Sequence, residues 1–356
     1  MNCPSLTDLP FVEGQTGFPW TEGSELPPQY IAQNLPKISI VTPTFNQGHY
    51  IEATIRSVLL QNYPNLEFII IDGGSTDNTL EIIKKYTNFI HFWVSEPDNG
   101  QSDAINKGLQ HATGDVFNWL NSDDLLAPNA LWTIGKAFSK APQTSALIGF
   151  MQFFDDKNVL SKPYRMSFDF NDVPKTLISV SFMTQPSLFY RLDALQLLRG
   201  VDTRLYYCMD LDLWIRFIAE FGAEHIEFSD TSLSYFRVHA LAKSQNSYAA
   251  YDERRAVFLS MLSALNVPKF LLKKLDNGAK GLNFDRKWNF STSFLHQTQT
   301  VTAYIIEHLL IFPHYNYPIF TSFRAWLFSF NKKSLGRRRY FYSLPLRFIY
   351  RKIKQI

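Results

Sequence analysis

From residue 37 onward, short continuous apolar runs alternate with segments in which apolar residues recur at helical spacing. The continuous runs are typical of buried strands and cover residues 37–42, 66–72, 91–96 and 116–121. The intervening segments predict helices over 49–61, 75–86 and 102–112, the second opened by Ser75, Thr76 and Asp77 as capping residues. Strands that alternate with helices of about three turns indicate an α/β protein with a mostly parallel sheet.

Three of these strands end in polar sequences that a hydrophobic core does not need. "TPTFNQG" follows the first strand, "DGGSTD" ends the second, and "NSDD" ends the fourth. Because ligands of such sheets bind beyond the carboxyl ends of the strands, we expect these loops to converge on a binding site.

The sequence "NSDD" at 121–124 carries the strongest chemical signal. Carboxylates at the end of a buried strand are costly unless a cation meets them. Hard divalent cations prefer carboxylate oxygens, and one or two suffice when a diphosphate supplies further ligands. The alternative interpretation puts Asp123 and Asp124 in the first turn of a helix over 128–138, where they would favour the helix dipole. This alternative does not easily explain why Asn121 and Asp123 occur together at the end of a strand.

The other two loops are weaker evidence when each is taken alone. Asp72 precedes Gly73 and Gly74 and could either accept hydrogen bonds from a base or ribose, or cap its own turn. No G-x-G-x-x-G follows the first strand and no G-x-x-x-x-G-K-[ST] occurs, which argues against dinucleotide oxidoreductases and P-loop proteins.

Composition bounds the class of protein. The chain has 356 residues, of which 46% are hydrophobic and 19% charged, enough for one large or two modest domains. Cys3 and Cys208 are the only cysteines, so neither a disulfide framework nor a CxxC metal site is available. The N-terminus has no basic segment followed by an apolar run, so we expect a cytoplasmic protein.

The stretches "ISIVTPTFNQGHYIEATIRSVLLQNYPNLEFIIIDGGSTDNT" and "GQSDAINKGLQHATGDVFNWLNSDD" closely resemble glycosyltransferase family 2, inverting enzymes with the GT-A fold. "TQPSLFYR", "MDLDLWIRF" and "SYFRVH" resemble acceptor-side elements of its soluble bacterial members. The resemblance runs from about Lys37 to His239. It implies a GT-A catalytic domain with a Rossmann-like sheet over 37–240. The resemblance does not extend to either flank, where the composition predicts an irregular arm over 1–36 and a helical, aromatic and basic region over 241–356.

The resemblance also implies an activity and a cofactor. We expect metal-dependent transfer of a hexosyl group from a nucleotide sugar, a UDP-sugar in particular, to a glycan or lipid-linked acceptor. Such reactions belong to cell-envelope polysaccharide or lipopolysaccharide synthesis, and the cofactor would be Mn²⁺ or Mg²⁺. In an inverting displacement a carboxylate takes the proton of the attacking hydroxyl, and the metal neutralises charge on the leaving diphosphate.

Residue by residue, the resemblance makes Asp210 the catalytic base and Asp123 and His239 the metal ligands. The positions matched to nucleotide-sugar binding are Pro43, Thr44, Asp72, Asp103, Asn121 and Ser122. Asn121 departs from the family's Asp-x-Asp metal motif, because an amide replaces the first acid. We expect nucleotide contact to be retained there and metal affinity to be weakened.

Several alternatives remain at the level of sequence. Spacing in a helix begun near Met209 does not choose between Asp210 and Asp212, and a lone histidine such as His239 is by itself more typical of a structural residue. A catalytically weak nucleotide-sugar or glycan-binding subunit is the second function, to which Asn121 points. A nucleotidyltransferase is the third, but "TPTFNQGHY" lacks the basic residues that its first loop would carry.

Charge is distributed unevenly along the chain. Ten of the 35 Lys and Arg residues follow Phe323, and no acid follows Glu307, so the rest holds 25 bases and 32 acids. Residues 302–330 are apolar but too interrupted for a spanning helix. Residues 345–356 predict a basic amphipathic helix, which suits an anionic membrane surface at the inner face of the cell membrane. The acidic body argues against nucleic acid as a partner.

Aromatic residues near the predicted acceptor side have two interpretations. Phe189, Tyr190, Tyr206 and Tyr207 suit stacking on a sugar face, and they suit a hydrophobic core equally well.

Overall fold

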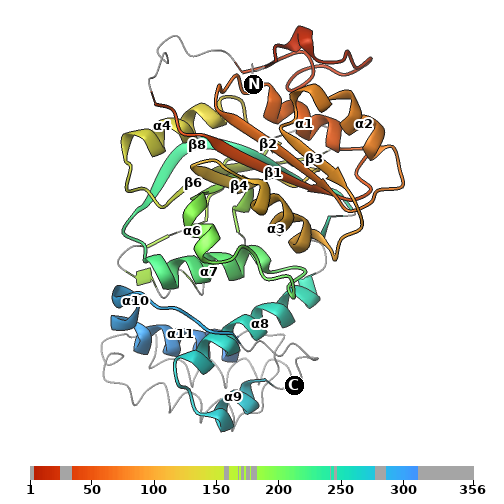
Figure 1. Ribbon diagram of the computed structural model, residues 1–356. Helices are drawn as coiled ribbons and strands as arrows, with labels where there is room; N and C mark the ends of the chain where they lie inside the picture. The colour runs from red at the N-terminus through yellow and green to blue at the C-terminus, as the bar shows by residue number, and fades with distance from the viewer. Residues whose placement is uncertain are drawn as a thin grey trace. The chain divides into compact units, whose positions relative to one another are not determined.

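The computed structural model forms two compact units (Figure 1). It describes residues 4–24, 34–155, 160–166, 168–169, 172–173, 177, 183–240, 242–243, 247–276 and 286–311. The first unit comprises Met1–Met166, Phe182–Leu213 and Glu224–Gln245. The second comprises Ser167–Ser181, Trp214–Ala223 and Asn246–Ile356. The N-terminal arm therefore groups with the predicted catalytic domain.

A single eight-stranded sheet runs through the first unit in the order β3-β2-β1-β4-β7-β6-β8-β5. Its strands are β1 Ile38–Thr44, β2 Leu66–Asp72, β3 Phe92–Ser95, β4 Val116–Trp119, β5 Leu125–Leu126, β6 Ala146–Phe154, β7 Leu188–Arg191 and β8 Ile226–Arg237. The first four strands by sequence pair in parallel, as do β6 and β8. Strand β7 lies antiparallel between β4 and β6, and β5 runs antiparallel to β8. The predicted mostly parallel α/β sheet is confirmed.

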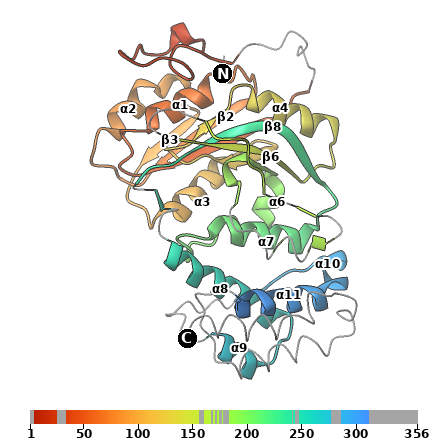
Figure 2. The same cartoon turned by 180° about the vertical axis from the view of Figure 1, so that it is seen from behind.

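Helices cover both faces of this sheet. They are α1 Ile51–Leu59, α2 Thr79–Lys85, α3 Gln101–His111, α4 Ala130–Lys140 and α6 Leu192–Leu197, with short 3₁₀ turns at Leu6–Asp8, Thr87–Phe89 and Gln185–Ser187. Helices α1, α2 and α4 lie on one face, and α3 and α6 on the other (Figures 1 and 2).

Successive side chains of β1 point to opposite faces of the sheet, and those on each face pack against a helix. Ile38 and Ile40 belong to the core cluster that includes the apolar side of α1, where Ile51 and Ile55 are buried. On the opposite face α3 approaches β1 so closely that a Cβ on Gly108 would lie 2.3 Å from Val41 Cγ1. The glycine is therefore required for this helix to pack against the strand.

The described part of the N-terminal arm is fastened to α1 by one buried cation. The Arg56 guanidinium donates to the carbonyl oxygens of Pro10, Pro19 and Trp20 at 2.9 to 3.0 Å. It also lies 5.4 Å from the centre of the Trp20 ring. Hydrogen bonds to several backbone carbonyls satisfy the buried charge and hold the arm in place.

The described part of the second unit is helical. Helix α7, Met209–Phe221, begins in the first unit, and the second unit continues with α8 Ser247–Ala264, α9 Lys269–Leu275, α10 Thr292–His296 and α11 Thr298–Ile311. Residues 312–356, on which the basic amphipathic helix was predicted, lie outside the described residues. Among the helices that are described, none is both long enough and apolar enough to cross a membrane.

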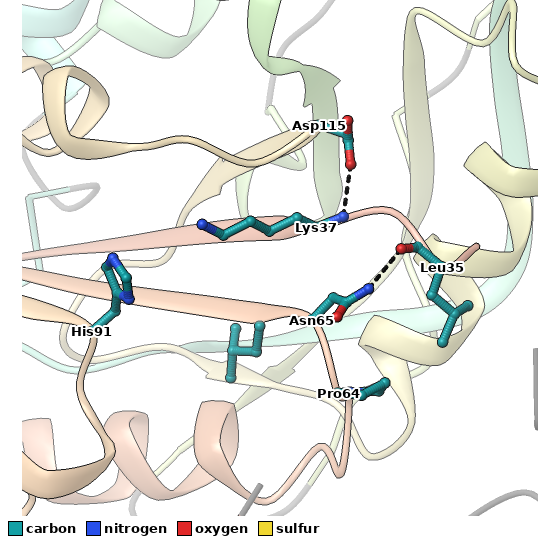
Figure 3. Close-up of a pocket in the computed structure, with 7 residues that line it drawn as sticks. Leu35, Lys37, Pro64, Asn65, His91 and Asp115 are labelled. Carbon is teal, nitrogen blue, oxygen red and sulfur yellow. Dashed lines mark hydrogen bonds between the residues drawn. The ribbon is translucent and has the colours of Figure 1, made fainter. Parts of the chain in front are cut away.

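A hollow of about 420 Å³ lies at the amino ends of the parallel strands (Figure 3). Its lining consists of Leu35, Lys37, Pro64, Asn65, Leu66, His91 and Asp115. Figure 3 shows that these polar groups are engaged locally: Asp115 accepts from the Lys37 backbone, and Asn65 donates to the Leu35 carbonyl. The hollow lies at the edge opposite to the loops singled out in the sequence.

Candidate functional site

The carboxyl ends of β1, β2 and β3 lie in register. Thr44 pairs with Asp72, and Asp72 pairs with Ser95 on the other side. The loops that follow β1 and β2 are then tied together, since the Asn46 amide donates to Ser75 Oγ at 2.7 Å and the Gly48 amide to Asp77 Oδ2 at 2.9 Å. The two polar loops thus form one continuous surface at this edge, as expected.

Asp72 is fully buried and organises the turn after β2. Its carboxylate accepts from the backbone amides of Gly74 and Ser75 and from the hydroxyls of Ser75 and Ser95. These four hydrogen bonds match the number that a carboxylate ordinarily accepts, so the structure of the turn is enough to explain an acid at position 72. A contact with the base stays a prediction.

The predicted start of the second helix was wrong by several residues. Helix α2 begins at Thr79, because Ser75 is used by Asp72, and Thr76 donates from its amide to Asn46 Oδ1. Asp77 does act at this helix start, where Oδ1 accepts from the Thr79 backbone at 3.0 Å.

The sequence 121–124 forms a loop between β4 and β5. Trp119 ends β4 as a buried residue, and Leu125 begins β5, while α4 does not start until Ala130. The interpretation that Asp123 and Asp124 form the first turn of that helix is therefore wrong.

Asp123 and His239 meet across the site. Asp123 Oδ2 lies 3.0 Å from His239 Nε2, which joins the loop after β4 to the segment that follows β8. The His239 side chain is only 5% exposed and that of Asp123 is 23% exposed. The Nδ1 atom of His239 is buried and has no hydrogen-bond partner among the described residues. The two residues predicted as metal ligands are thus brought together.

A cation of the protein itself, Arg237 on β8, lies beside this loop. Its Nε donates to the Asp123 carbonyl at 3.0 Å, and its backbone amide donates to Asp124 Oδ1 at 3.0 Å. The guanidinium lies between two aromatic rings, 5.0 Å from the centre of Tyr50 and 4.2 Å from that of Phe154.

Asp124 is buried beside Asp123. Burial, followed by the negative charge of Asp123, raises the pKa of the Asp124 carboxyl, whereas the Arg237 amide, the Asn121 side chain and the Arg237 charge oppose the rise. Both oxygens of Asp124 face N–H donors, since Oδ2 accepts from Asn121 Nδ2 at 3.2 Å. Asp124 is therefore a residue of the loop's interior, and Asp123 is the carboxylate with access to solvent.

The remaining nucleotide-site predictions lie at the same edge. Pro43 and Thr44 end β1 as buried residues, and Thr44 Oγ1 has no hydrogen-bond partner within the described part of the chain. Asp103 lies in the first turn of α3, where Oδ2 accepts from the Asn99 amide at 3.0 Å. Ser122 is buried, and its carbonyl accepts from Thr54 Oγ1 at 2.9 Å. Their contacts with a nucleotide stay predictions.

The two candidate bases differ in exposure. Asp210 and Asp212 both lie at the start of α7; Asp212 is fully buried, whereas Asp210 is partly exposed and accepts from the Leu211 amide at 2.7 Å. Of the four aromatics noted in the sequence, Phe189 and Tyr190 are core residues, and Tyr206 is 49% exposed.

The donor set at Asp123 and His239 suits a divalent cation. Among the described residues, no group of three or more His, Cys, Asp and Glu side chains gathers to hold a metal. One carboxylate oxygen and one imidazole nitrogen still fit Mn²⁺ or Mg²⁺, because such ions take further ligands from substrate phosphates. The observation that favours this fit is the placement of His239 Nε2 3.0 Å from Asp123 Oδ2, while the buried Nδ1 has no hydrogen-bond partner among the described residues.

Sequence reasoning missed three residues of the site. Arg237 ends β8, a strand of mixed polar and apolar residues, so the surrounding sequence did not mark it as a residue of the site. Gln101 donates to Asn121 Oδ1 at 2.7 Å, and Lys243 donates to Gln101 Oε1 at 2.9 Å. No local pattern marks these two, since their partners are distant in sequence.

Comparisons with known proteins indicate the family that the chain resembles. Residues 39–199 match the family model described as "Glycosyl transferase family 2". An uncharacterized glycosyltransferase of Rickettsia typhi is 27% identical over 250 residues, which are 67% of this chain and 76% of that protein. TuaG of Bacillus subtilis, provisionally assigned to teichuronic acid biosynthesis, is 41% identical over 92 residues, or 25% of this chain and 36% of its own length.

Among solved structures, S. aureus TarS 1–349 in complex with UDP-GlcNAc superposes with a TM-score of 0.54 at 19% identity. The match covers 80% of this chain and 82% of that one. It shows a shared GT-A fold.

Proposed function

The chain carries a glycosyl transferase family 2 domain, and on this premise we propose that it is an inverting glycosyltransferase dependent on a divalent metal. The observation that carries the proposal is the pairing of Asp123 Oδ2 with His239 Nε2 at 3.0 Å, at the carboxyl end of the sheet. A solvent-accessible carboxylate and a buried imidazole at this position suit a divalent cation whose remaining ligands come from the diphosphate of a nucleotide.

We propose a UDP-sugar as the donor. The support is the resemblance of Asp72 and its turn to the base-binding element of the family, together with the shared fold of TarS, whose structure contains UDP-GlcNAc. Pro43, Thr44, Asp103, Asn121 and Ser122 complete the proposed nucleotide-sugar site.

In the proposed reaction the acceptor hydroxyl attacks the anomeric carbon while the bond from that carbon to the diphosphate oxygen breaks. Asp210 takes the hydroxyl proton, a role for which its partial exposure suits it better than the fully buried Asp212. Asp123 and His239 would hold the cation, which, when bound, neutralises charge on the leaving nucleoside diphosphate.

The proposed acceptor is a glycan or lipid-linked glycan of the cell envelope. This class of acceptor is supported by the family resemblance and by the name of TuaG, which refers to teichuronic acid biosynthesis. The basic residues after Phe323 would place the enzyme near an anionic membrane surface.

The test is turnover of a panel of nucleotide sugars with Mn²⁺, with Mg²⁺ and with EDTA. We expect release of free nucleoside diphosphate that EDTA and Asp123→Ala abolish. Asp230→Ala, at an exposed residue of β8, is the control and should leave the rate unchanged. Full activity in EDTA would refute the metal dependence.

The same experiment separates the other functions. A nucleotidyltransferase would release or consume pyrophosphate instead of a nucleoside diphosphate. A nucleotide-sugar-binding subunit would bind the donor and form no product.

A further inference from the structure

A continuous chain of hydrogen bonds crosses the candidate site from Lys243 to Asp124. Lys243 Nζ donates to Gln101 Oε1 at 2.9 Å, and Gln101 Nε2 donates to Asn121 Oδ1 at 2.7 Å. Asn121 Nδ2 then donates to Asp124 Oδ2 at 3.2 Å. We call these four side chains the polar relay.

The two ends of the polar relay fix the orientation of both amides. An ammonium group only donates, so the oxygen of Gln101 faces Lys243 and its NH₂ group faces Asn121. At the other end, Asp124 Oδ1 accepts from the Arg237 amide and Oδ2 accepts from Asn121. The residue at 121 must therefore accept on one side and donate on the other.

An amide meets both requirements, and an ionised acid does not. A carboxylate at 121 would still accept from Gln101, but it has no hydrogen to donate to Asp124 Oδ2, so the donor that Asn121 supplies in this buried position would be lost. Asp124 is nearly inaccessible to solvent, so water does not replace the lost donor.

We propose that Asn121 is a positioning residue, whose amide holds the loop that presents Asp123, and that the acid of an Asp-x-Asp motif is incompatible with this site. The loop is further held by Thr54 Oγ1, which donates to the Asp124 carbonyl at 2.7 Å, and by Arg237 on the Asp123 carbonyl. Asn121→Asp recreates the Asp-x-Asp sequence. We expect it to move Asp123 away from His239 and so to weaken the binding of nucleotide and metal.

The functional consequence rests on the proposed function, whereas the polar relay itself does not. The experiment uses the full chain and four variants: Asn121→Asp, Asp124→Asn, the double variant that combines them, and Asn62→Asp. In the double variant the new carboxylate at 121 accepts from Gln101 and from the new amide at 124, whose oxygen accepts from Arg237. The direction of every hydrogen bond is then satisfied with the charge unchanged.

Asn62→Asp is the matched control. Asn62 Nδ2 donates to the Ser24 carbonyl at 2.6 Å, so the substitution also removes a partly buried amide donor. Asn62 lies beyond the carboxyl end of α1, near the arm, and makes no contact with the polar relay in the described structure.

Urea unfolding tests the polar relay without any ligand. We expect both single variants at 121 and 124 to unfold at lower urea than the wild type, and the double variant to recover about half of the loss or more. Losses that simply add in the double variant would overturn the proposal.

Calorimetry with UDP and Mn²⁺ tests the consequence for the site. We expect Asn121→Asp to weaken binding by about 10-fold or more, the double variant to recover most of it, and Asn62→Asp to bind like the wild type. Binding by Asn121→Asp as tight as the wild type, or an equal loss in Asn62→Asp, would overturn the proposal. Absence of UDP binding by the wild type would instead refute the proposed UDP-sugar donor, and the unfolding result would still decide the polar relay.

Discussion

Asp210 and Asp212 lie two residues apart in α7 and have different environments. Asp212 is fully buried, so its substitution acts first on the packing of the helix. Asp210 is partly exposed and can face a hydroxyl that arrives from solvent. The general base must meet the acceptor, which makes exposure the property that separates the two.

We expect Asp210→Asn to lower kcat by roughly 10²–10⁴-fold with little change in donor binding, because an amide keeps the shape but takes no proton. Asp212→Asn should instead lower the thermal unfolding midpoint, and its folded fraction should keep more of the activity. Rates and donor affinities of both variants, corrected for folded protein, check this. The assignment is wrong if Asp212→Asn proves the more damaging of the two to kcat.

At this scale the sequence singled out the loop at 121–124 but not the reason for its composition. Asn121 stood out as an amide where an acid was expected, yet its partners are Gln101 and Asp124, and the next member of the chain is Lys243. Gln101 and Lys243 are 142 positions apart, so no local pattern reports that they meet. Asp123 and His239 were paired in advance only because the family resemblance placed both.

Among the elements, the strand pair β6 and β8 is contacted by two arginines in similar settings, Arg237 at the end of β8 and Arg165 in the segment that follows β6. Arg237 lies between the rings of Tyr50 and Phe154 and donates to the Asp123 carbonyl. Arg165 lies 4.5 Å and 4.8 Å from the ring centres of Phe150 and Phe228 and donates to the Ser229 carbonyl. One arginine supports the site, and the other supports the strands alone.

We expect Arg237→Lys to weaken the binding of UDP with Mn²⁺ by about 10-fold or more, since lysine keeps the charge but loses the planar stack and the Nε donor. Arg165→Lys should lower stability to a similar degree and leave the affinity unchanged. Calorimetry and urea unfolding of the two variants separate the effects. Equal losses of affinity would mean that Arg237 acts only through the stability of the strand pair.

Glu67 on β2 organises the amino ends of the strands, opposite the site. It is fully buried and accepts from Ser39 Oγ at 2.6 Å and from the Thr113 amide at 2.7 Å, with Lys37 Nζ 2.5 Å away. Burial alone would raise the pKa of Glu67, but these hydrogen bonds outweigh it and lower the pKa to about 2.

Because the folded pKa lies below the unfolded value of 4.5, Glu67 stabilises the fold above that pH and loses its contribution as the pH falls toward 2. We expect Glu67→Gln to lower the free energy of unfolding at pH 7 by roughly 3 kcal/mol and to flatten its decline between pH 5 and pH 2. Urea unfolding across this range measures both effects. Glu81→Gln, at an exposed residue of α2, should match the wild type throughout; an unchanged pH profile in Glu67→Gln would contradict the role.

Element prediction succeeded where one pattern dominated and failed where tertiary contacts competed. The run at 66–72 forms β2 with the predicted bounds, because a short continuous run of mostly apolar residues is typical of a strand that is buried on both faces. The start of α2 moved to Thr79 because Asp72 takes Ser75 into its own turn. The antiparallel placement of β7 between β4 and β6 depends on long-range pairing, which periodicity does not encode.

For the whole molecule, charge asymmetry along the chain carries the remaining prediction. The residues up to Phe323 hold 25 bases and 32 acids, and those after it hold ten bases and no acid. An anionic membrane attracts the second set and repels the first, so the ten bases decide whether the chain binds. A tail whose bases pack against the acidic rest of the protein would show no such attraction.

We expect the full chain to sediment with vesicles that contain phosphatidylglycerol and to be released as salt is raised, because the attraction between exposed charges is screened. Replacing the three arginines at 337–339 by glutamine should weaken binding by up to about 3 kcal/mol, since each base near such a surface contributes up to about 1 kcal/mol. A chain that ends at Asn331 should lose binding altogether. The matched control removes the same charge elsewhere, by replacing the exposed Lys84, Lys85 and Lys140 with glutamine, and should sediment like the wild type. If the control and the arginine variant behave alike, or if salt has no effect, the tail does not bring this glycosyltransferase to a membrane.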